Sequence, residues 1–114
     1  MTDHDFMAAF EDASLDASLF DHTAHIRMGW LYATRYPLAE AIARFARTLK
    51  AYTKALGCED KYHETITWFY MLLIAQRQAR TTAATFDTFL AKNGDLVASP
   101  SILTRYYRPE TLAA

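Results

Sequence analysis

Three histidines and a glutamate stand in two short segments whose residue types suit metal binding or proton transfer. His22 and His25 form an H-x-x-H pair, and His63 and Glu64 are neighbours in the segment Lys-Tyr-His-Glu-Thr. Residues three apart share a helix face, so His22 and His25 can point at one ligand. Three imidazoles with an open fourth position suit zinc, whereas two imidazoles and a carboxylate suit iron. The sequence therefore predicts a divalent metal (zinc or iron) held by His22, His25 and His63, with Glu64 as catalytic base or ligand.

Hydroxyl groups follow both segments at helical spacing. Tyr32 continues the His25 face, Thr67 and Tyr70 continue the His63 face, and Tyr62 precedes His63. These hydroxyls predict a small polar ligand as the alternative to a metal. A purely structural interpretation also stays open, because histidines and acids are ordinary residues at helix starts. Whether the protein is an enzyme is left open.

The elements that would position these residues are helices. Asp21 is a good N-cap for a helix over residues 22–36, and Asp60 for one reaching about residue 80. Each histidine segment then falls in the first turn of its helix. The two helices are separated by a single helix with short connections, so an up-down arrangement would make them parallel. Their N-termini, and both segments, would then lie at one end of the bundle.

Apolar periodicity supports the same fold. Thr2 opens a first helix, the segment after Pro37 carries an apolar stripe, and Gly57 ends that third helix. The stripe consists of Leu38, Ile42, Phe45, Leu49, Tyr52 and Leu56. The fourth helix is apolar nearly all round, which predicts a central buried helix with Trp68 and Phe69 in the core. A fifth helix is expected to end near Lys92, and a short last one to cover about residues 101–107.

Length and composition bound the remaining possibilities. The 114 residues fit one all-α domain, a compact bundle of about five to six helices over residues 1–114. A net charge of −1 argues against nucleic acid as a partner, and no apolar stretch approaches the length of a membrane span. An acidic N-terminus and the single cysteine, Cys58, favour the cytoplasm.

Three strings in the sequence resemble those of a group of small, functionally uncharacterised bacterial proteins. They are F-x-H-x-x-H-I from Phe20, K-Y-H-E-T-I-T from Lys61, and S-I-L-x-R-Y-Y from Ser101. The resemblance runs from about residue 20 to residue 112 and supplies no activity. It implies that a signature of the group is formed by His22, His25, Tyr62, His63, Glu64 and Thr67.

Two functions from different classes are compatible with these observations. The leading hypothesis is a histidine/carboxylate site for a divalent metal or a small polar ligand. The rival is a non-catalytic interaction module that forms a homodimer, because the seam of the third helix and the many aromatic residues suit a partner helix as well as a core.

Overall fold

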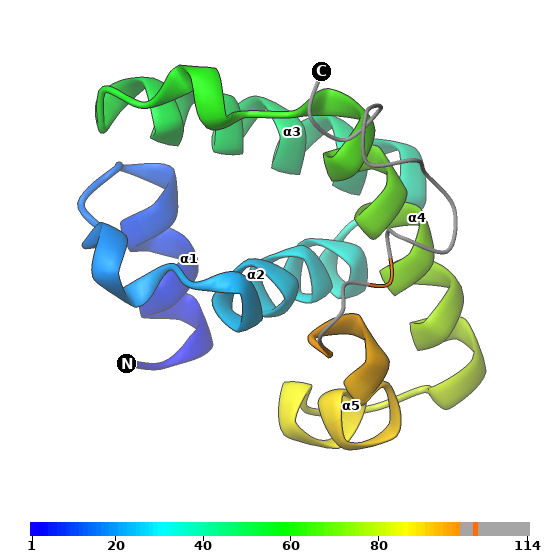
Figure 1. Cartoon of the computed structure of the whole chain (residues 1–114). Helices are drawn as coiled ribbons and strands as arrows, with labels where there is room; N and C mark the ends of the chain where they lie inside the picture. The colour runs from blue at the N-terminus through cyan, green and yellow to red at the C-terminus, as the bar shows by residue number, and fades with distance from the viewer. Residues whose placement is uncertain (99–101, 103–114) are drawn as a thin grey trace.

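The computed structural model describes residues 1–98 and residue 102. These residues form five α-helices and three short 3-10 turns, and no strand occurs among them (Figure 1). The predicted all-α bundle is therefore confirmed, whereas the helix expected near residues 101–107 falls outside the described residues except for Ile102. Within the described part, no helix is both long and apolar enough to cross a bilayer. In chain order the elements are α1 (Asp3–Glu11), η1 (Ala17–Leu19), α2 (His22–Arg35), α3 (Leu38–Ala55), η2 (Glu59–Lys61), α4 (Glu64–Thr81), α5 (Phe86–Lys92) and η3 (Gly94–Leu96).

Side-chain caps define the first two helices. The Thr2 hydroxyl accepts a hydrogen bond from the Asp5 amide at 3.1 Å, and the Asp21 carboxylate accepts one from the Ala24 amide at 2.9 Å. Both caps match the sequence prediction. The stop after α3 also matches, because Gly57 has a φ of 73°, a conformation that costs glycine little.

The start of α4 differs from the prediction. Asp60 lies inside the turn η2, and Tyr62 is extended with φ −71° and ψ 130°, so the helix does not begin there. The cap is His63 instead, whose ring nitrogen Nδ1 accepts a hydrogen bond from the Ile66 amide at 3.3 Å. The predicted Asp60 cap is therefore wrong, because the extended residue after η2 delays the helix by one turn.

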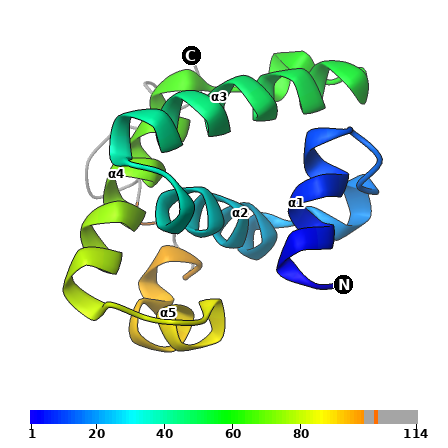
Figure 2. The ribbon, with the colours of Figure 1, turned by 180° about the vertical axis from the view of Figure 1, so that it is seen from behind.

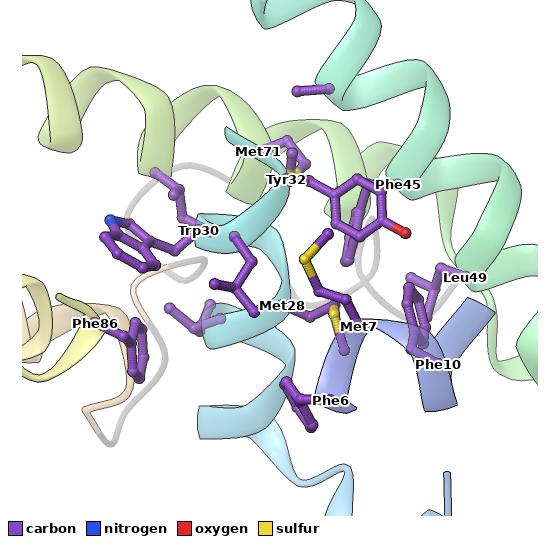
Figure 3. Packing of buried hydrophobic residues seen from close by; sticks show 14 of the residues in the cluster. Phe6, Met7, Phe10, Met28, Trp30, Tyr32, Phe45, Leu49, Met71 and Phe86 are labelled. Atoms are coloured by element: carbon purple, nitrogen blue, oxygen red, sulfur yellow. The ribbon is translucent and has the colours of Figure 1, made fainter. Parts of the chain in front are cut away.

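The core is one cluster of buried side chains to which all five helices contribute, and the α3 stripe packs where α1, α2 and α3 meet. Four residues of the predicted α3 stripe are buried, whereas Leu38 and Leu56 at its ends are 48% and 40% exposed. Figure 3 shows the middle of the stripe facing aromatic side chains from α1 and α2, with Phe10 against Tyr32 and Phe45. The stripe thus packs in the core as predicted, except at its two exposed ends. Its buried members are Ile42, Phe45, Leu49 and Tyr52.

Helix α4 crosses α2 instead of running alongside it, as both ribbon views show (Figures 1 and 2). One face, with Met71 and Ile74, is fully buried, but Trp68 and Leu72 on another face are 46% and 48% exposed. The expectation that α4 is buried on all sides, with Trp68 in the core, is therefore wrong. An all-round apolar sequence does not say which face the neighbouring helices cover.

Helices α2 and α4 approach each other closely at Gly29. A Cβ atom at this position would lie 3.0 Å from Ile74 Cδ1 and 3.1 Å from Met71 Sδ, tighter than ordinary contact. Glycine therefore allows the crossing. The same residue lines a small cavity on the side toward the N-terminus of α2.

Candidate functional site

Two adjoining cavities lie between α2, α3 and α4. The smaller has a volume of about 100 Å³ and the larger about 320 Å³. His22 and Tyr70 line the smaller one, and Tyr62 and His63 line the larger one. Four residues line both and so mark the junction between them: His25, Leu49, Ile66 and Thr67. Side chains from both sequence segments thus line two cavities that share a wall, although α4 crosses α2.

His25 stands at the junction of the two cavities. Its ring stacks on Phe20 with centroids 3.9 Å apart. Burial, and to a smaller extent the neighbouring His22, lowers the pKa of His25 to about 4. The negative charge of Asp21 opposes this shift. The imidazole is therefore neutral near pH 7, with one nitrogen donating and the other accepting hydrogen bonds.

His22 links α2 to the turn η3. Its Nε2 atom lies 3.0 Å from the Leu96 carbonyl oxygen, and because a carbonyl only accepts, Nε2 carries the proton. The ring also meets Tyr70 edge-on, with centroids 5.5 Å apart. His22, one of the three predicted metal ligands, therefore uses Nε2 in a structural hydrogen bond, and its Nδ1 atom is the nitrogen that remains for a ligand.

His63 combines a cap with a position on the larger cavity. Its Nδ1 atom accepts from the Ile66 amide, so a neutral ring carries its proton on Nε2. The Thr67 hydroxyl donates to the His63 carbonyl oxygen at 2.9 Å and is buried between the two cavities. His63, Thr67 and Tyr62 form the polar part of the cavity wall on the α4 side.

Glu64 points away from these cavities. It is exposed, accepts a hydrogen bond from the Tyr62 hydroxyl at 3.1 Å, and lines an open groove beside Trp68. Burial, and then the bond to Glu64, raises the pKa of Tyr62 to about 12. Tyr62 therefore stays protonated and lies between the larger cavity and Glu64.

No protein family model, curated protein or solved structure matches this chain. Among residues 1–98 and 102, no group of three or more histidine, cysteine, aspartate or glutamate side chains is spaced to hold a metal ion. The geometry that the structure does supply is a set of polar side chains around an apolar cavity.

Tyr32 lies apart from the other predicted ligand-binding residues. It is buried against Phe10 and Phe45 and lines neither of the two cavities. Burial raises the pKa of Tyr32 to about 12. Thr48 and Glu11 lie nearby, but no described residue reaches hydrogen-bonding geometry with the hydroxyl. Tyr32 thus belongs to the core of the bundle.

Some cavity residues carried no functional signal in the sequence. Lys61 and Cys58, from the connection between α3 and α4, line the larger cavity. Leu49 and Tyr52 also line it, although their spacing identified them only as members of the α3 stripe. An apolar stripe shows which face is covered but not where the covering helix leaves a gap.

Proposed function

We propose that the protein binds a small organic molecule in the two adjoining cavities. The observation that carries the proposal is that His25 of α2 and His63 at the start of α4 line the same cavity. Its volume of about 320 Å³ falls at the lower end of small-molecule sites, which span roughly 300–1,000 Å³. Such sites combine mostly apolar walls with a few placed polar groups, and this cavity has both.

The lining points to a planar molecule with one polar end. Leu49, Ile66 and Phe20 supply apolar walls that suit an aromatic ring. The neutral His25 imidazole and the Lys61 ammonium can donate to a carboxylate, hydroxyl or amide oxygen. The Tyr62 hydroxyl, which donates to Glu64, can accept from a ligand hydroxyl or amide N–H. An aromatic acid, phenol or amide of the size of benzoate fits this pattern of walls and polar groups.

A divalent metal, zinc or iron, is the second candidate for the same place. Neutral imidazole is the form that binds metals, and the low pKa of His25 keeps it in that form. His63 would contribute Nε2, because Nδ1 serves the cap. A catalytic role for Glu64 requires its carboxylate to leave Tyr62 and turn toward the cavity.

Thermal unfolding with benzoate, phenol and benzamide as probes tests the first proposal. At least one probe should raise the melting temperature of the wild type. Thr67→Val, which removes a cavity hydroxyl at nearly constant volume, should weaken that rise. Thr23→Val is the control, because Thr23 is an exposed residue of α2 that lines neither cavity. Equal shifts in wild type and Thr67→Val would place binding elsewhere.

A further inference from the structure

We propose that α4 carries a dimerisation surface on which the α4 helix of a second copy packs antiparallel. The surface is a row of residues at steps of four along the helix, and every one of them is exposed. We call this row the α4 ridge. It consists of Glu64, Trp68, Leu72, Gln76 and Arg80.

The centre of the α4 ridge is apolar and open. Trp68 is 46% exposed and Leu72 is 48% exposed, and both line a surface groove of about 720 Å³ together with Thr65 and Gln76. Two large apolar side chains side by side on an exposed helix face favour association with a partner surface. The groove is separate from the cavities of the proposed ligand site, because none of its lining residues lines either cavity.

The residues of the α4 ridge are ordered so that two antiparallel copies of it would match each other. Leu72 is central, Trp68 and Gln76 flank it, and Glu64 and Arg80 form the two ends. In an antiparallel pair with a two-fold axis at Leu72, each leucine meets its own copy. Each Trp68 then meets Gln76 of the second copy. A two-fold interface requires this kind of self-complementarity.

Charge favours the same arrangement. Among the residues that the structure describes, Glu64 bonds the Tyr62 hydroxyl alone and no carboxylate forms an ion pair with Arg80. An antiparallel pair brings Glu64 of each copy to Arg80 of the other, whereas a parallel pair would set Glu64 against Glu64. Antiparallel packing also places the positive end of each helix dipole beside the negative end of the other. A second copy of this chain is therefore the occupant that the α4 ridge matches.

Helix-packing geometry gives the expected strength. Residues at steps of four form ridges inclined by about 26° to the helix axis, and two such ridges align when the axes cross at about 50°. A steeply crossed pair of single helices buries less than about 1,200 Å², the range of weak and transient interfaces. The dimer should therefore form and dissociate reversibly at protein concentrations in the micromolar range.

Sedimentation velocity over a concentration series tests the proposal. The wild type should pass from monomer to dimer, and Leu72→Glu should raise the dissociation constant more than about 100-fold. Leu38→Glu is the matched control, because Leu38 is equally exposed at 48% but lies at the start of α3. This variant should dimerise like the wild type.

Charge reversal tests the antiparallel register. Glu64→Arg and Arg80→Glu alone should each weaken dimerisation about tenfold, because both copies lose an attraction and gain a repulsion. The two changes combined in one chain should restore the wild-type constant. A double variant as weak as the single variants would overturn the register.

Two results would overturn the dimer itself. One is a monomer at every concentration. The other is that Leu72→Glu lowers the melting temperature of dilute, monomeric protein, whereas Leu38→Glu leaves that temperature unchanged. That result would show that Leu72 packs within its own chain and not against a second copy.

Discussion

The imidazole of His25 lies against the ring of Phe20, with centroids 3.9 Å apart and planes inclined by 28°. Phe20 directly precedes Asp21, the cap of α2, so the fold of the η1–α2 connection holds the ring in place. The stacking removes one face of the imidazole from water, while an edge remains on the cavities. The contact thus contributes to the burial that lowers the pKa of His25, and it orients the ring.

Folding stability should fall in acid because of His25. Its pKa is about 4 in the folded protein and 6.5 in an unfolded chain, so between these values the unfolded chain binds more protons. The free energy of unfolding should be constant above pH 6.5 and decrease as pH drops toward 4, by up to about 3 kcal/mol. Urea unfolding at a series of pH values measures this slope.

Replacement of the histidine isolates its contribution. His25→Gln should flatten the slope between pH 6.5 and 4, whereas His4→Gln should leave it unchanged because His4 is exposed on α1. Parallel slopes for wild type and His25→Gln would show that folding does not lower the pKa of His25.

His63 should contribute to stability as a helix cap. His63→Ala removes the acceptor of the Ile66 amide and should lower the free energy of unfolding by about 1 kcal/mol. His63→Asn supplies another side-chain acceptor and should recover most of the loss. Equal losses in both variants, measured by urea unfolding at pH 7, would count against the cap.

The α3 stripe makes a strong prediction about the core. Phe45→Ala and Leu49→Ala should each cost about 2–5 kcal/mol, because both side chains are buried. Arg47→Ala, on the exposed face of the same helix, should change stability by less than about 0.5 kcal/mol. Chemical denaturation of the three variants tests the orientation of α3, which would be wrong if Arg47→Ala proved the costliest.

The metal proposal has its own test. If Zn²⁺ or Fe²⁺ binds His25 and His63, it should raise the melting temperature at pH 7.5, and less so as protons compete at lower pH. Either His25→Gln or His63→Asn should remove most of the rise, and the pair of changes should add little. Elemental analysis of untagged protein provides the second readout. If the purified protein is metal-free and neither ion changes its melting temperature, a metal site at His25 and His63 is excluded.

The sequence predicted α3 well and α4 poorly for one physical reason. Helix α3 has an apolar face, the stripe, opposite a charged face. The sequence of this helix alone therefore predicts which side is buried. Around α4 the residues from Ile66 to Ile74 are mostly apolar, and the pattern has no polar side. Which face becomes buried then depends on where α2, α3 and α5 lie, and this left Trp68 and Leu72 exposed.

The residues of the candidate site were also predicted only in part. Helix order and first-turn positions predicted that His22, His25 and His63 meet at one end of two parallel helices. The helices cross instead, and His25 and His63 line the larger cavity, whereas His22 lines only the smaller one. Tyr32 follows His25 on the same helix face, but two turns carry it about 10 Å along the axis. Since α4 crosses α2 instead of following it, Tyr32 meets Phe10 and Phe45 and lies away from the cavities.

Carbon-detected NMR of ¹³C-histidine-labelled protein tests the proposed ligand site most directly. The chain has four histidines, of which His4 is exposed on α1 and lines neither cavity. Titration with whichever of benzoate, phenol or benzamide raises the melting temperature should shift the His25 and His63 resonances together, with one dissociation constant, and leave His4 unmoved. Binding that shifts His4, or that raises the melting temperature while the His25 and His63 resonances stay constant, would contradict a ligand site between α2, α3 and α4.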